Sequence, residues 1–137
     1  MPAPDSLQRL TRRRQFLFVR AGLRASRPNV LIEARRREPG GAIGAGFTTS
    51  KRVGGAVERN RARRRLREAV RVLLPELGVA GVDYVFVARP QTPYAPWPTL
   101  LDDLRNALIR LRAELETGQR KPRPRGRRQP SKSTESD

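Results

Sequence analysis

The sequence predicts a small α+β domain in which a central mixed sheet is packed by helices, with a basic helix at about 57–74. Three observations support this fold class. Apolar residues recur at helical spacing around Leu66 and again from Leu101 to Leu115. Segments 29–37, 42–50 and 83–89 have the β-branched and apolar content of strands. A chain of 137 residues is long enough for one domain and a tail.

The first elements are a flexible arm and a short helix. Residues 1–10 contain two prolines and little pattern, which indicates the arm. Thr11 is a candidate N-cap for a helix from Arg12 to about Arg20, and Gly22 would stop it. Phe16 and Val19 share one face of this helix. Phe16 is therefore either a core residue or an aromatic residue of a binding site.

The strands follow in two groups. Segments 29–37 and 42–50 flank the turn at 38–41, so we expect them to pair as an antiparallel hairpin. Segment 83–89 is nearly continuous in apolar residues, which places it inside the sheet. The order is then α-β-β-α-β-α, with one more short strand if 23–27, before Pro28, is counted.

The basic helix has one apolar side and one cationic side. The segment from Lys51 to Arg71 holds nine Lys or Arg and two Glu, and Pro75 with Gly78 would end the helix. At about 100° per residue, a set of polar residues falls opposite Leu66: Asn60, Arg61, Arg64, Arg67, Glu68 and Arg71. Arginines at 59, 63, 67 and 71 repeat one charge four residues apart, whereas solvated helices usually alternate the sign. A solvated charged face remains the alternative to a polyanion-binding face.

The C-terminal part contains a loop, a helix and a tail. Tyr94 and Trp97 lie in a proline-rich loop at 91–98, where they either pack on the domain edge or stack on RNA. Thr99 and Asp102 predict a capping box for a helix to about Glu116. The segment 118–137 has seven basic residues and no large apolar residue, so we expect a disordered basic tail.

Composition indicates a polyanionic partner and excludes several chemistries. Lys and Arg number 30 against 13 Asp and Glu, a net charge of +17. The absence of Cys and His excludes zinc fingers, disulfides and imidazole catalysis. Asp102 and Asp103 form the only adjacent acidic pair and lie at a helix start, so we predict no catalytic residues and no metal ligands. No stretch approaches 18 apolar residues, so we expect a cytoplasmic protein and no membrane partner.

One stretch resembles the signature of bacterial ribonuclease P protein components. It reads KRVGGAV at 51–57, RNR at 59–61 and RRRLRE at 63–68. The resemblance extends over about residues 9–116 and implies the order α-β-β-β-α-β-α. It also implies that residues 11–117 form an RNA-binding domain, with the tail at 118–137 outside it.

The resemblance implies a protein subunit that assists removal of the 5′ leader from precursor tRNA. The expected partners are a catalytic RNA subunit, bound one-to-one, and precursor tRNA, with the chemistry carried by Mg²⁺ held mainly on the RNA. Eight residues would bind the RNA subunit: Lys51, Arg52, Arg59, Asn60, Arg61, Arg63, Arg64 and Arg67. Phe16 and Arg20 would bind the leader, although Arg20 stands where the family often has an aromatic residue.

Two other functions remain as alternatives. A ribosomal or RNA-assembly protein would share the basic tail and the α+β domain. A nuclease acting alone is disfavoured by the missing histidines and the scattered carboxylates.

Overall fold

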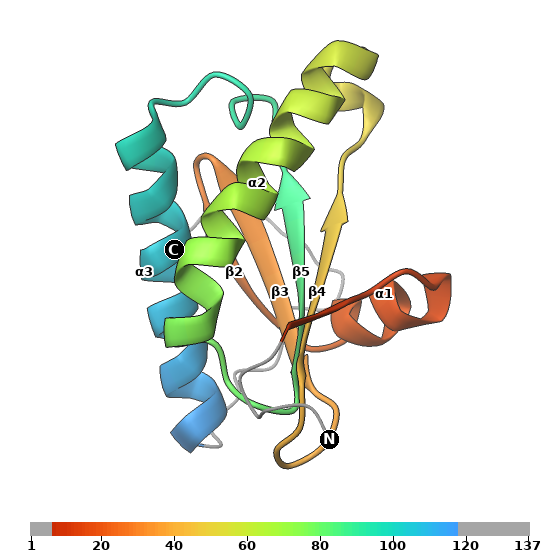
Figure 1. Ribbon diagram of the computed structural model, residues 1–137, viewed down its shortest axis with the longest axis vertical. Helices are drawn as coiled ribbons and strands as arrows, with labels where there is room; N and C mark the ends of the chain where they lie inside the picture. The colour runs from red at the N-terminus through yellow and green to blue at the C-terminus, as the bar shows by residue number, and fades with distance from the viewer. Residues whose placement is uncertain (1–6, 118–137) are drawn as a thin grey trace, which may run out of the picture.

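The computed structural model describes residues 7–117 as a five-stranded sheet with helices on both faces (Figure 1). The strands are β1 (Leu7–Arg9), β2 (Leu23–Arg27), β3 (Val30–Arg36), β4 (Ile43–Thr48) and β5 (Val82–Ala88). The helices are α1 (Arg13–Arg20), η1 (a 3₁₀ turn, Lys51–Val53), α2 (Ala56–Leu77) and α3 (Trp97–Thr117). The predicted α+β class with a mixed sheet is confirmed, and the short strand at 23–27 is present. The predicted tail at 118–137 lies outside the described residues.

The strand order is β1-β4-β5-β3-β2, so the predicted hairpin between 29–37 and 42–50 is wrong. β5 lies between these two strands, antiparallel to β3 and parallel to β4. The side chains of β5 are apolar on both faces of the sheet apart from Asp83. A central strand suits them, because both of its faces are covered by helices and both of its edges pair with other strands. The N–H groups of Arg37 and Glu38 donate to the Gly81 carbonyl at 2.8 and 3.2 Å, and the Gly81 N–H donates to the Gly41 carbonyl at 3.2 Å. These bonds tie the start of β5 to the loop between β3 and β4.

The end of the predicted N-terminal arm is a strand instead. β1 pairs in parallel with β4, and the N–H of Leu10 continues the ladder to the Ala45 carbonyl at 3.0 Å. Without β1, the outer edge of β4 would be unpaired. The sequence around residues 7–9 does not show that β4 requires this partner. The N-cap of α1 is Arg12 and not Thr11 as predicted. The Gln15 side chain accepts from the N–H groups of Thr11 and Arg12 at 2.9 and 2.8 Å.

Helices α2 and α3 cover one face of the sheet, where Tyr84 and Phe86 of β5 are fully buried (Figure 1). α2 extends past the predicted end at 74 to Leu77. Pro75 lies in the last turn, so the bend that a proline causes affects only the end of the helix, and the Gly78 N–H still donates to the Leu74 carbonyl at 2.7 Å. α3 begins at Trp97, two residues before the predicted cap at Thr99, because Pro98 suits a first helical turn.

Helix α1 covers the other face of the sheet, packing on β2, β3 and β5. Leu10, Val19 and Val85 form a second, smaller core, and Phe16 and Phe18 pack against it. A Cβ on Gly46 would lie 2.7 Å from the Phe16 ring. The bare backbone of β4 therefore lets this ring lie directly on the sheet.

Candidate nucleic-acid interface

The exposed side of α2 carries the predicted cationic surface. Ala62, Leu66, Ala69 and Leu73 are buried, which confirms the apolar side expected from the sequence. The residues opposite are all exposed, and we call five of them the arginine face: Asn60, Arg61, Arg64, Arg67 and Arg71. Glu68, the acid among them, forms an ion pair with Arg71.

The loop before α2 brings Lys51 and Arg52 to the start of the arginine face. The Ser50 hydroxyl accepts from the Arg52 N–H at 3.2 Å and begins η1. Val53 is buried and anchors this turn in the core, while Lys51 and Arg52 stay exposed. Gly54 then adopts φ +139°, a conformation that favours glycine.

Gly55 is the N-cap of α2, as its position in the sequence allows. Its N–H donates to the Glu58 side chain at 3.0 Å, so one of the unpaired amides at this helix start is satisfied within the protein. The Glu58 carboxylate also reduces the positive charge at the first turn of α2.

Arg59 and Arg63 lie beside the arginine face and are partly buried. Arg63 donates to the Thr49 hydroxyl at 3.2 Å and to the Asn60 side chain at 3.1 Å. Its position on the flank of the helix agrees with the helical periodicity. Its guanidinium is held in place by the loop that follows β4.

Two arginines one turn apart on α2 hold the loop between β5 and α3. Arg61 Nε donates to the Pro93 carbonyl at 2.6 Å. Arg65 donates to the Thr92 and Ala95 carbonyls at 2.7 and 2.6 Å, and its guanidinium lies 5.8 Å from the centre of the Trp97 ring. Burial, and next the charge of Arg61, lower the pKa of Arg65. This contact could not be predicted from the sequence, because any arginine of the motif could make it.

The predicted leader-binding residues lie across the sheet from α2. Phe16 is partly buried over Gly46, and Arg20 is exposed at the end of α1. The two residues are four apart and share a helix face. The structure thus separates the ten predicted residues into a set of eight on η1 and α2 and a pair on α1, on opposite faces of the sheet (Figure 1).

A groove of about 420 Å³ separates β1 from α2 and extends the arginine face. Arg9, Arg67 and Arg71 line it together with the apolar side chains of Leu7 and Phe47. Arg9 is absent from the predicted set because residues 1–10 were expected to be an arm. Only the pairing of β1 with β4 places it beside α2.

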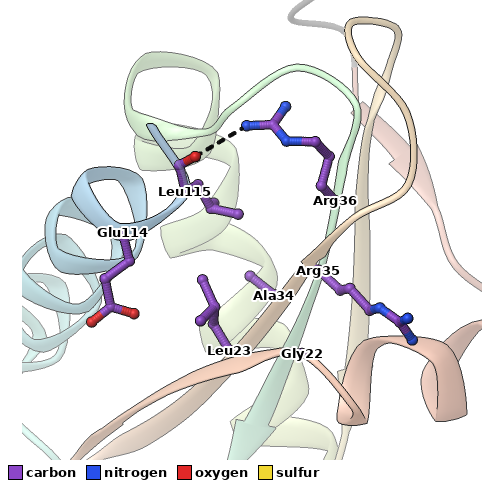
Figure 2. Close-up of a pocket in the computed structure, with 7 residues that line it drawn as sticks. All are labelled: Gly22, Leu23, Ala34, Arg35, Arg36, Glu114 and Leu115. Atoms are coloured by element: carbon purple, nitrogen blue, oxygen red, sulfur yellow. Dashed lines mark hydrogen bonds between the residues drawn. The ribbon is translucent and has the colours of Figure 1, made fainter. Parts of the chain in front are cut away.

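A second pocket, of about 490 Å³, lies where β2 and β3 meet the end of α3 (Figure 2). Arg36 donates to the Leu115 carbonyl at 3.4 Å, and Arg35 turns away toward α1, where it donates to the Phe18 carbonyl at 3.1 Å (Figure 2). Both guanidiniums are thus engaged with protein carbonyls. None of the predicted site residues lines this pocket.

Three of the described carboxylates are engaged in structural contacts. Asp103 accepts from the backbone and side-chain N–H groups of Asn29 at 3.0 and 2.9 Å, and Asp102 pairs with Arg105. Burial raises the pKa of Asp83 although the ion pair with Arg37 opposes the shift. Within residues 7–117, no three Asp or Glu gather in a way that could hold a metal ion.

None of the helices in this part of the chain has the length and hydropathy that crossing a bilayer requires.

Comparison with known proteins identifies the family. The family profile described as Ribonuclease P matches residues 5–112. The ribonuclease P protein component of Caulobacter vibrioides (strain NA1000 / CB15N) is 46% identical over 119 residues, covering 85% of this chain and 80% of the relative. That of Ruegeria pomeroyi is 46% identical over 114 residues, covering 81% and 91%.

Solved structures share the fold. The RNase P protein from Thermotoga maritima superposes with a TM-score of 0.65 at 24% identity, covering 75% of this chain and 96% of that one. The Staphylococcus aureus RNase P protein gives a TM-score of 0.65 at 20% identity, with coverage of 75% and 94%. On the family match and the sequence identities, this chain belongs to the family of ribonuclease P protein components.

Proposed function

We propose that this chain is the protein subunit of a ribonuclease P ribonucleoprotein and binds a catalytic RNA through the arginine face. The observation that carries the proposal is the exposure of Lys51 and Arg52 on η1 together with that of the arginine face on α2. Guanidinium groups bind phosphate oxygens in a bidentate manner, and the repulsion among them is relieved when a polyanion binds. The net charge of +17 supports the same partner.

The α1 face is proposed to bind the 5′ leader of precursor tRNA. Phe16 offers part of an aromatic ring for stacking, and the exposed Arg20 offers a planar guanidinium on the same helix face. Because α1 and α2 lie on opposite faces of the sheet, the domain can contact two RNA segments at once. The protein would then reduce the repulsion between catalytic RNA and substrate.

The protein would bind and orient RNA rather than supply catalytic side chains. Mg²⁺, when bound to the assembled particle, would activate the water that cleaves the leader. The described carboxylates do not form a donor set for such an ion, so we propose that the RNA holds it. The cytoplasmic location and the one-to-one stoichiometry with the RNA belong to the same proposal.

The experiment is cleavage of a precursor tRNA at low Mg²⁺ by the RNA subunit, the protein, or both. We expect efficient cleavage only when the two are combined. Cleavage by the protein alone would contradict the assignment of the chemistry to RNA. If the protein stimulates no cleavage while still binding structured RNA, the assembly-protein alternative is correct.

A double variant tests the arginine face. Arg64→Ala with Arg67→Ala removes two exposed guanidiniums, and we expect weaker binding to the RNA subunit with unchanged thermal stability. Arg105→Ala with Arg110→Ala, which also removes two exposed guanidiniums but from α3, is the matched control. Equal effects of the control and the double variant would show that only total charge matters.

A further inference from the structure

Tyr94 has an unusual position among the aromatic residues of this protein. It is 65% exposed, whereas the other six aromatic side chains are buried or partly buried. Its hydroxyl makes no hydrogen bond with the described residues, and its ring contacts no other ring there. Tyr94 is therefore not a packing residue of the domain edge.

The backbone around Tyr94 is held firmly although its side chain is exposed. Its neighbours Pro93 and Ala95 are buried, and their carbonyls accept from Arg61 at 2.6 Å and from Arg65 at 2.6 Å. Thr92 is fully buried, and its hydroxyl donates to the Asn29 carbonyl at 2.7 Å and accepts from the Arg89 N–H at 2.8 Å. The loop thus presents one aromatic ring on a rigid support, which limits the entropy lost when a ligand binds it.

The support belongs to the same helix that carries the arginine face. Arg61 and Arg65 lie one helical turn apart on α2. Arg64, which lies between them in sequence, is exposed. Arg64, Arg65, Glu68 and Trp97 line a shallow groove of about 330 Å³ next to this loop. Tyr94 is thus an exposed ring on a loop held by Arg61 and Arg65, and the exposed Arg64 lies on the same helix. This combination suits single-stranded RNA, because a base can stack on the ring while a guanidinium meets a phosphate.

We propose that Tyr94 stacks on an unpaired base of the RNA subunit and forms part of the same interface as the arginine face. This inference rests on the proposed function, since it takes the RNA bound by α2 as the ligand. Stacking on Tyr94 requires a base that is neither paired nor stacked within an RNA helix. The site therefore selects a nucleotide in a bulge or loop and not one in a duplex.

The test measures the affinity of the RNA subunit for four proteins: the unaltered chain, Tyr94→Phe, Tyr94→Leu and Tyr94→Ala. Stacking predicts that Tyr94→Phe keeps its affinity and that Tyr94→Ala loses about 5- to 150-fold. Tyr94→Leu should be weakened nearly as much, because it keeps apolar area but has no ring. Thermal unfolding should be unchanged in all three variants. Ile109→Ala, which removes an exposed apolar side chain from α3, is the control.

Chemical probing of the RNA subunit provides a second measurement. At least one unpaired nucleotide should be protected by the unaltered protein and by Tyr94→Phe and be reactive again with Tyr94→Ala. Unchanged affinity and protection in Tyr94→Ala, with weaker binding by the Arg64 and Arg67 double variant, would overturn the role of Tyr94 and leave the proposed function intact. If the unaltered protein does not bind the RNA subunit, both proposals fail.

Two other partners are distinguished in the same series. If the assembled particle with Tyr94→Ala binds precursor tRNA more weakly but its RNA subunit affinity is unchanged, the ring contacts substrate, and the proposal is wrong. Sedimentation of the free protein tests a protein partner. A dimer that becomes a monomer in Tyr94→Ala would show that a second copy covers the ring, which also contradicts the proposal.

Discussion

Replacing Arg65 by alanine is expected to destabilise the domain, although the residue lies within the RNA-binding motif. Its guanidinium donates to the Thr92 and Ala95 carbonyls at 2.7 and 2.6 Å and lies 5.8 Å from the Trp97 ring centre. A hydrogen bond to a charged group contributes about 1.5–3 kcal/mol. A cation–π contact at an exposed site contributes about 0.5–1 kcal/mol. Because one guanidinium shares these contacts and is only partly buried, we expect a total loss of about 2–4 kcal/mol.

Urea unfolding and thermal unfolding measure this loss. For a domain of this size, about 1 kcal/mol changes the Tm by about 4 °C, so the expected decrease is about 8–16 °C. Arg64→Ala is the matched control, because Arg64 is the preceding residue and makes no hydrogen bond or ion pair within residues 7–117; we expect its stability to change by less than about 0.5 kcal/mol. Arg65→Lys should fall between the two, since an ammonium group cannot reproduce the fork. Equal stability of Arg65→Ala and Arg64→Ala would refute this reasoning.

Three further predictions concern the rest of the chain. Gly46→Val should displace the Phe16 ring, which lies 2.7 Å from the position of an added Cβ, so cleavage of precursors with a leader should be impaired while RNA subunit affinity is retained. Tyr84→Phe leaves the Val79 N–H without its acceptor and should cost about 1–3 kcal/mol near neutral pH, measured by urea unfolding. Burial raises the pKa of Tyr84 to about 12, so its stabilising contribution is complete below about pH 10 and is lost as the pH rises through about 12; Tyr84→Phe should lack this loss. Deletion of 118–137 should reduce the salt dependence of RNA binding by about 0.7–0.9 per lost phosphate contact without changing the cleavage site.

The parts of the fold that depend on local periodicity could be predicted from the sequence. The buried side of α2 follows directly from the spacing of Ala62, Leu66, Ala69 and Leu73, and the exposed arginines follow from the same spacing. The pairing of strands could not be predicted in this way. The turn at 38–41 favours a local hairpin, and only the competition of β5 for the same two edges decides against it.

The candidate site was predicted in part for the same reason. Motif residues such as Arg64 and Arg67 are exposed as expected. Arg61 and Arg65 look identical to them in sequence, yet they bind the carbonyls of a loop about 30 residues later. Arg9 was missed because the partner of β1 lies far along the chain. Contacts between distant segments therefore account for the wrong strand pairing and for those neighbours of α2 that local periodicity does not predict.

The central position of β5 has a consequence for how the chain folds. During synthesis β3 and β4 leave the ribosome before β5. In a shortened chain that ends at residue 80, the edges of β3 and β4 that β5 later occupies are open and can pair with each other across the loop at 37–42. The local hairpin that the sequence favours is then a competing structure, which must open before β5 can insert. Refolding should accordingly show a slow phase that shortens when the β3–β4 loop is altered to disfavour a tight turn.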